Sequence, residues 1–174
     1  MTPGKGSRIK GATAELEVAN LLQDWWRALE PGCAFKRTPG SGGWGNPEVR
    51  GEFKTSGDLV TTAKRFPFSI EVKRRENWAL STVIKGKPSP VWNWWEQAKK
   101  QGVEMHKEPM LLLRHSREKW RCLLTIELSR LLELPWLLVT NPVGEALKLA
   151  YLEDLLVLDP LYVAAKIEAE QCRG

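Results

Sequence analysis

Paired cysteines and histidines are missing from this chain. Its 174 residues include three cysteines and two histidines, and no Cys-x-x-Cys pair occurs. Zinc modules and disulfide-stapled domains depend on such paired spacings, so the sequence argues against both classes. Three scattered thiols are typical of a protein from a reducing compartment.

Long apolar runs are also missing. The most apolar stretches, near 134–139 and 155–165, are interrupted by proline or aspartate. They fall short of the roughly 20 apolar residues that cross a bilayer. The residues that follow the basic N-terminus are too polar for a signal peptide. We therefore expect a soluble protein with no membrane partner, located in the cytoplasm, or in the host cytoplasm if the source is viral.

Negative charge is scarce in the first part of the chain. Residues 1–124 carry 22 basic and 13 acidic side chains, a formal charge of +9. Residues 125–174 carry 4 basic and 8 acidic side chains, a charge of −4. A basic part of this size attracts a polyanion such as nucleic acid, although a basic surface that is merely solvated has the same composition. Charge alone leaves both interpretations open.

The spacing of apolar residues predicts the element order αβββαββ. Apolar positions three and four apart predict a helix over 7–29, and Ser89 followed by Pro90 predicts a second helix that runs to about Gly102. Runs of apolar and alternating residues predict strands at 33–37, 58–61, 66–73, 110–114 and 120–125. The leucine-rich residues after Ile126 are expected to be mostly helical.

Glu71 and Lys73 show the most informative spacing. Residues two apart on a strand point to the same side, so this pair faces away from the apolar Ile70 and Val72. If the strand of Asp58 pairs with theirs as a hairpin, two carboxylates approach each other and need a cation, and such oxygen ligands suit Mg²⁺ or Mn²⁺. A metal beside a lysine favours phosphodiester hydrolysis. A solvent-exposed ion pair on an amphipathic strand is the simpler alternative.

The run Gly57-Asp58, twelve further residues, and Glu71-Val72-Lys73 resembles the metal-binding signature of the PD-(D/E)xK nuclease superfamily. More narrowly, Lys-Gly-Ala-Thr-Ala-Glu at 10–15 and Phe-Lys-Arg-Thr-Pro-Gly-Ser at 35–41 are similar to motifs of archaeal-type Holliday junction resolvases. The resemblance covers roughly residues 5–125. It departs from the family at Gly57, where proline is common, and in an insertion near 43–55.

The resemblance implies the residues of a metal-dependent active site. Asp58 and Glu71 would bind Mg²⁺, with Mn²⁺ as a substitute, and the carbonyl of Val72 would assist. Lys73 would be the catalytic lysine, and Glu15 would complete the site from the first helix. Glu17 is the rival of Glu15, but Glu15 occupies the matching place in the motif.

DNA contacts are expected from residues near this site. The resemblance implies that Lys10, Arg37 and Ser41 hold or orient phosphates. Lys64, Arg65, Arg74 and Arg75 lie in or beside the strands of the site, and contacts with phosphates are expected of these as well. Trp44, in a glycine-rich loop, would stack on an unpaired base or be buried.

The second predicted helix carries further candidates. Gln97 would either face solvent or reach the site, and the stripe of Trp92 and Trp95 is expected in the core or at a dimer contact. Neither His106 nor His115 is assigned a catalytic role.

Taken with the resemblance, the sequence predicts a restriction-endonuclease-like α/β fold with a mixed central sheet flanked by helices. Residues 1–125 would form the nuclease domain, and 126–174 a helical C-terminal extension packed on it or at a dimer interface. The expected activity is metal-dependent resolution of four-way DNA junctions by paired symmetric nicks, which requires a two-fold homodimer on branched double-stranded DNA. The alternatives are a nuclease of this fold that acts on flaps, ends or restriction sites, and a DNA-binding module without turnover.

Overall fold

The fold is built around a mixed sheet of five strands with helices on both faces. A computed structural model describes residues 5–38 and 57–172, with side chains described from Gly11 onward. The first part of the chain forms α1 (Lys5–Trp26), β1 (Phe35–Arg37), β2 (Leu59–Thr61), β3 (Phe68–Arg74), α2 (Leu80–Ile84), α3 (Pro90–Met105), β4 (Glu108–Arg114) and β5 (Arg121–Thr125). The second part forms α4 (Ile126–Leu132), β6 (Leu137–Thr140), β7 (Ala146–Tyr151), α5 (Leu152–Leu156) and α6 (Pro160–Gln171).

The strand order of the central sheet is β3-β4-β5-β7-β6. β3 and β4 are parallel, and the other neighbours are antiparallel. The predicted mixed α/β sheet and the elements of the αβββαββ order are therefore confirmed. Because β3 ends the order, one side of it has no strand of this sheet beside it.

The tail after Ile126 differs from the prediction in its strands. It contains the three helices α4, α5 and α6, but also β6 and β7, which were not predicted. β7 pairs with β5 along five residues, so the tail extends the same sheet that carries β3. The short helix α2 was not predicted either.

The expected hairpin between the strand of Asp58 and β3 does not form. β2 pairs instead with β1, antiparallel, in a separate two-stranded sheet. Asp58 immediately precedes β2, and its backbone N–H donates to the carbonyl of Ile70 at 3.0 Å. The approach of Asp58 to β3 was thus predicted correctly, but the strand pairing that was to cause it was wrong.

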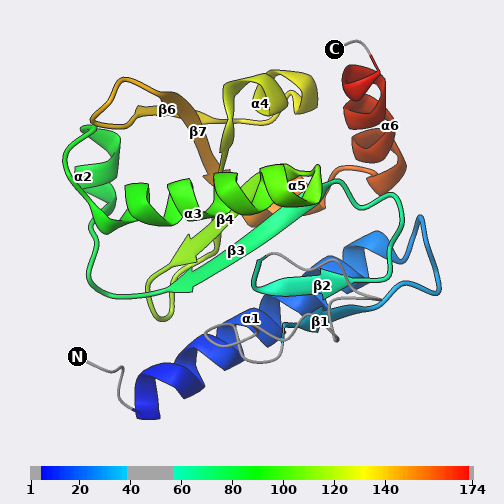
Figure 1. The fold of residues 1–174 in the computed structure, drawn as a ribbon, viewed down its shortest axis with the longest axis horizontal. Helices are drawn as coiled ribbons and strands as arrows, with labels where there is room; N and C mark the ends of the chain where they lie inside the picture. The colour runs from blue at the N-terminus through cyan, green and yellow to red at the C-terminus, as the bar shows by residue number, and fades with distance from the viewer. Residues whose placement is uncertain (1–4, 39–56, 173–174) are drawn as a thin grey trace.

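Side chains that alternate along the strands belong to two separate apolar clusters, one on each face of the sheet. Ile70 and Val72 join a cluster that includes residues of α1, α4 and α6. Leu111 and Leu113 belong to a second cluster, which includes Trp92, Trp95 and Ala98 of α3. Helices therefore cover both faces, and Figure 1 shows α1 and α3 on opposite sides of β3. The prediction that the tryptophan stripe of α3 lies in the core is confirmed.

No helix in the described part of the chain is both long enough and apolar enough to span a membrane. The longest helix, α1, has 22 residues, and its sequence mixes apolar with charged positions.

Candidate active site

Glu71 lies at the middle of β3, and its side chain is completely buried. Lys73, two residues further on the same side, donates a hydrogen bond from Nζ to Oε1 of Glu71. The Nζ atom also lies 3.9 Å from Oδ2 of Asp58. The predicted same-side arrangement is therefore present. The alternative of a solvent-exposed pair on the strand is excluded, because Glu71 has no exposed surface.

Asp58 is held against the free side of β3 by two hydrogen bonds. Its Oδ2 accepts from the backbone N–H of Val72 at 2.8 Å, and its own N–H donates to Ile70. An edge strand offers unpaired backbone groups, and Asp58 takes up two of them here. The preceding Gly57 makes this approach possible, since it adopts a φ of 111°. Asp58 is 7% exposed, so its carboxylate is held in a largely buried site.

Glu15 reaches the same region from α1. Its carboxylate accepts a hydrogen bond from Nε of Arg37, and the residue is 7% exposed. Glu17, its rival in the sequence, lies elsewhere: it accepts hydrogen bonds from Arg114 and from Nε1 of Trp120. The structure thus brings Glu15, and not Glu17, toward Asp58.

The carboxylates of the site disfavour each other's charge. Burial and the neighbouring charge of Asp58 raise the pKa of Glu71 to about 7, against the opposing effect of Lys73. Burial, together with the charge of Asp58, also raises the pKa of Glu15, although Arg37 acts in the other direction. Negative charges gathered in a buried site are stabilised by a cation. The electrostatics therefore suit a site that receives positive charge.

The donor set fits a hard divalent cation. Oε2 of Glu71 is buried and has no hydrogen-bond partner among the described residues. Carboxylate oxygens are the ligands that Mg²⁺ and Mn²⁺ prefer. Within the described ranges, no three Asp, Glu, His or Cys side chains already converge as a metal cluster. The fit therefore rests on Asp58 and Glu71, the two carboxylates that Lys73 Nζ approaches.

Gln101 of α3 is a site residue that the sequence analysis missed. Its side chain is close enough to Glu71 to lower the pKa of that carboxyl, against the larger effect of burial. Gln97, the glutamine considered from the sequence, is exposed. The buried residues of α3 include Trp95 and Ala98, and Gln101 lies three residues beyond Ala98 on the same side of the helix. The spacing of the apolar residues along α3 could therefore have identified Gln101 as a residue that faces the sheet.

The residues expected to contact DNA lie in different parts of the chain. Ser41 and Trp44 lie outside the described residues, as does the side chain of Lys10, whose backbone belongs to α1. Arg37 lies at the site itself, where it pairs with Glu15. Lys64 is exposed on the loop between β2 and β3.

The remaining three arginines have different surroundings. Arg65 forms a two-pronged ion pair with Glu168 of α6, at 2.8 and 2.7 Å. Arg74 is the last residue of β3, and Arg75 follows it with its N–H bonded to the carbonyl of Arg114. Arg74 and Arg75 therefore lie close in the chain to Lys73, whereas Arg65 secures the C-terminal helix.

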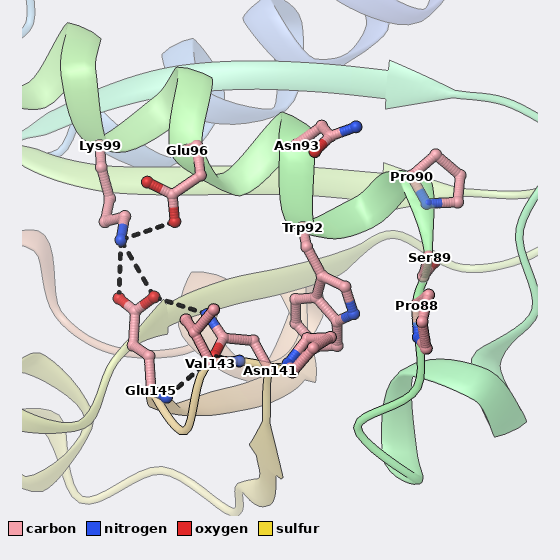
Figure 2. A pocket seen from close by; sticks show the side chains of 11 residues that line it. Pro88, Ser89, Pro90, Trp92, Asn93, Glu96, Lys99, Asn141, Val143 and Glu145 are labelled. Atoms are coloured by element: carbon pink, nitrogen blue, oxygen red, sulfur yellow. Dashed lines mark hydrogen bonds and ion pairs between the residues drawn. The ribbon is translucent and has the colours of Figure 1, made fainter.

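A separate open pocket lies at the start of α3. It has a volume of about 930 Å³ and lies between α3 and the β6–β7 turn, as Figure 2 shows for Trp92, Asn93 and Val143. None of Glu15, Asp58, Glu71 and Lys73 lines it. The pocket is therefore distinct from the carboxylate site.

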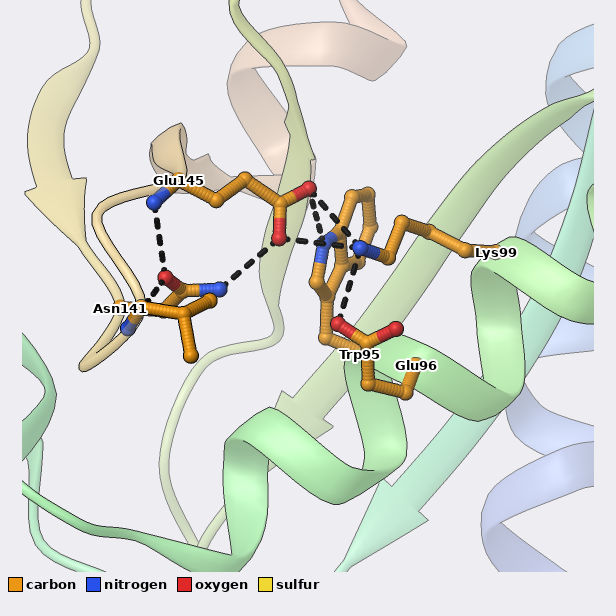
Figure 3. Close-up of polar contacts among 6 residues, drawn as sticks. Trp95, Glu96, Lys99, Asn141 and Glu145 are labelled. Carbon is orange, nitrogen blue, oxygen red and sulfur yellow. Dashed lines mark hydrogen bonds and ion pairs between the residues drawn. The ribbon is translucent and has the colours of Figure 1, made fainter.

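Glu145 joins the two walls of this pocket. Its carboxylate accepts from Lys99 Nζ at 3.0 Å, from Trp95 Nε1 at 3.1 Å and from Asn141 Nδ2 at 2.8 Å, as Figure 3 shows. Burial alone would lower the pKa of Lys99, but hydrogen bonds to Glu96 and Glu145 raise it. Glu145 thus satisfies the indole N–H of the fully buried Trp95 and ties the β6–β7 turn to α3.

We expect replacement of Glu145 by alanine to lower stability and to leave the DNA cleavage expected from the sequence unchanged. The change leaves the indole N–H of buried Trp95 without its acceptor, which costs about 1–3 kcal/mol. Glu96→Ala is the matched control, because Glu96 is 59% exposed and pairs with the same lysine; exposed pairs contribute at most about 1 kcal/mol. Thermal unfolding and cleavage assays on both variants test this. Loss of cleavage by a folded Glu145→Ala protein would contradict it.

Comparisons with known proteins identify the family of this chain. Protein D14 of Escherichia phage T5 is 25% identical over 118 residues, which cover 66% of this chain and 68% of that protein. A solved structure of Hjc, a Holliday junction resolvase of Archaeoglobus fulgidus, shows 22% identity over 84% of this chain and 94% of the other, with a TM-score of 0.41. The family model of the phage putative PDDEXK endonucleases matches residues 6–136, the part that carries α1, β3 and α3. The expected membership of the PD-(D/E)xK nucleases is thereby confirmed, and the chain belongs to the family of phage putative PDDEXK endonucleases.

Proposed function

We propose that this nuclease is a Mg²⁺-dependent endonuclease that resolves four-way DNA junctions by paired symmetric nicks. The observation that carries the catalytic part is the buried Glu71, with Lys73 and Asp58 beside it at the free side of β3. A protein that only binds DNA gains nothing from carboxylates placed near phosphates. The arrangement therefore supports turnover over a non-catalytic binding module.

Asp58 and Glu71 would hold the metal, assisted by the Val72 carbonyl and by Glu15, with Mn²⁺ as a substitute. When bound, the ion would neutralise charge on the phosphodiester and increase the acidity of a water molecule. Lys73 would orient the attacking water and stabilise the negative charge that develops on the phosphate. Arg37 would keep the carboxylate of Glu15 turned toward the site, since the two are hydrogen-bonded.

DNA would be held by cations around this site. Phosphate contacts fix the position of a nucleic acid on a protein and depend steeply on salt. We assign them to Lys10, Arg37, Ser41, Lys64, Arg65, Arg74 and Arg75, with Trp44 stacking on an unpaired base. Arg65 would contact DNA only in addition to its ion pair with Glu168.

The preference for junctions rests on the resolvase-like motifs at 10–15 and 35–41. Residues 1–125 would carry the catalytic machinery, and residues 126–174 would complete the sheet beneath it.

Two symmetric nicks need two active sites, so we propose a two-fold homodimer. Leu137 and Leu138 are 45% and 54% exposed on β6, the other edge strand of the sheet, and are candidates for its interface. The protein would act in recombination and repair of DNA in the cytoplasm, or in a host's cytoplasm if viral.

Cleavage of a synthetic four-way junction against a linear duplex of matching sequence tests the proposal. Wild type and Asp58→Asn are compared with Mg²⁺ and with EDTA. We expect paired nicks on the junction alone, abolished by EDTA and reduced at least about 100-fold by the substitution. Cutting of both substrates would assign the nuclease to other DNA, such as flaps, ends or restriction sites. Tight binding without cutting under any metal would favour the non-catalytic module.

A further inference from the structure

Two arginines lie side by side at the carboxyl end of the parallel strands. Arg74 of β3 and Arg114 of β4 are register partners. In-register residues of parallel strands point to the same face of the sheet, with backbones about 4.8 Å apart. Arg114 binds Glu17 of α1, so this is the face that α1 covers. Arg74 directly follows Lys73, so the pair lies beside the carboxylate site along β3, but on the other face of the sheet.

The pair carries more positive charge than its surroundings balance. Arg114 is paired with Glu17 and lies over the ring of Trp120, 4.3 Å from the ring centroid. Arg74 has no ion pair among the described residues. In the same part of the chain, neither arginine has an acceptor for its Nε, although both Nε atoms are buried. The two register partners therefore have one ion-paired carboxylate between them, that of Glu17 on Arg114.

Half-buried guanidinium groups are stabilised by an anion that supplies several acceptors. The side chain of Arg114 is only 13% exposed, so water screens it little. Phosphate oxygens match the planar fork of arginine, and two forks side by side can bind one phosphate together. The unbalanced pair is therefore suited to a single phosphodiester group.

We infer that Arg74 and Arg114 together bind one phosphate of the DNA, next to the phosphate that is cut. This assignment rests on the proposed function, and it adds Arg114, Glu17 and a shared phosphate to it. Lys73 and Arg74 are successive strand residues, so their side chains leave β3 on opposite faces. The edge strand would then lie between two neighbouring phosphates, one at the carboxylate site and one at the arginine pair. Glu17 competes with the phosphate for Arg114.

Binding in EDTA tests the inference without cleavage. The probes are a labelled duplex and a labelled four-way junction, and affinity is measured across a series of KCl concentrations. We expect Arg74→Gln and Arg114→Gln each to weaken binding roughly 5- to 20-fold and to reduce the salt slope by less than about one, because the other arginine still contacts the phosphate. Since one phosphate is shared, the double variant loses about one unit of slope in total. A loss of two units, or an unchanged slope in Arg74→Gln, would overturn the shared site.

Glu17→Gln has the opposite expected effect. Removing the competing carboxylate frees Arg114 for the phosphate, so DNA affinity rises several-fold. Asp24→Asn is the matched control, since it removes one carboxylate from the same helix at a position 70% exposed. If Glu17→Gln and Asp24→Asn raise DNA affinity equally, the gain comes from net charge alone. That result would contradict competition between Glu17 and the phosphate for Arg114.

Failure of this inference can be told apart from failure of the proposed function. Arg74 makes no ion pair in the described structure, so Arg74→Gln keeps the test valid even if Arg114→Gln unfolds. Lys100→Gln, an exposed change on α3, controls for the loss of one positive charge. If wild type cleaves the junction and Arg74→Gln binds DNA as tightly as wild type does, the arginine site is overturned and the proposed function is not. Wild type that neither binds nor cuts DNA overturns the nuclease proposal and this inference with it.

Discussion

Replacing Glu71 with glutamine is expected to abolish DNA cleavage and, at the same time, to stabilise the metal-free protein. Cleavage should fall by roughly 10³-fold or more, because the metal that we propose Glu71 holds would stabilise the transition state by several kcal/mol, and each 1.36 kcal/mol lost is tenfold in rate. Stability should rise because Glu71 is completely buried and its charge is opposed by that of Asp58. Opposite effects of one substitution on activity and stability are the signature of a site built for function.

The gain in stability should depend on pH. The pKa of Glu71 is about 7 in the folded protein and 4.5 in its reference state. Between these values the folded state binds more protons than the unfolded state, so wild-type stability falls as pH rises through this window. Glutamine does not titrate, so the variant should exceed wild type by about 1–3 kcal/mol at pH 8 and by little at pH 4.5.

Thermal unfolding in EDTA at both pH values checks this prediction. Addition of Mg²⁺ should then raise the melting temperature of wild type and not that of Glu71→Gln, since a ligand stabilises only a state that binds it. Glu96→Gln, an exposed substitution on α3, is the control and should change neither quantity. A Glu71→Gln protein that is less stable than wild type at pH 8 would mean that the Lys73 pair outweighs the cost of burial.

Local patterns predicted the strand that carries the site but not all of its pairing. Alternation along 66–73 indicates which residues share a side, and this was enough to place Glu71 with Lys73. It says nothing about the neighbouring strand, because pairing depends on contacts between distant segments. The expected hairpin was therefore wrong, while Asp58 still reached β3 through its own backbone and carboxylate.

The missed strands have a different cause. Leu137–Thr140 is an unbroken leucine-rich run, and short apolar runs do not separate strand from helix. The next strand, β7, does alternate, with Lys148 between Leu147 and Leu149, and the turn before it contains Pro142 and Gly144. That hairpin could have been predicted from these turn residues. The place of Gln101 near Glu71 could also have been predicted, but only by noting that it lies on the same side of α3 as the buried Trp95 and Ala98.

Gly57 is the second position where a small change should have a large effect. Its φ of 111° lies in a region that favours glycine, and an added Cβ would lie 2.8 Å from the carbonyl oxygen of Ile70. That carbonyl accepts the hydrogen bond from Asp58, so the clash falls on the contact that holds the carboxylate against β3. We expect Gly57→Ala to cost about 1–3 kcal/mol of stability through backbone strain. Cleavage should fall about 100-fold, because the carboxylate that we propose binds the metal would be displaced, and a shift of about 1 Å can have an effect of this size.

Proline at this position should be worse than alanine, although proline is common there in the superfamily. Its ring fixes φ near −65°, which is incompatible with the observed backbone. Gly32→Ala is the control, because no atom lies within 4 Å of the added Cβ and its φ is not in the left-handed region. Unfolding and cleavage of the three variants test the argument. If Gly57→Pro cut DNA like wild type, the backbone before Asp58 would have to adopt another conformation, and the way this chain positions its carboxylate would need a different explanation.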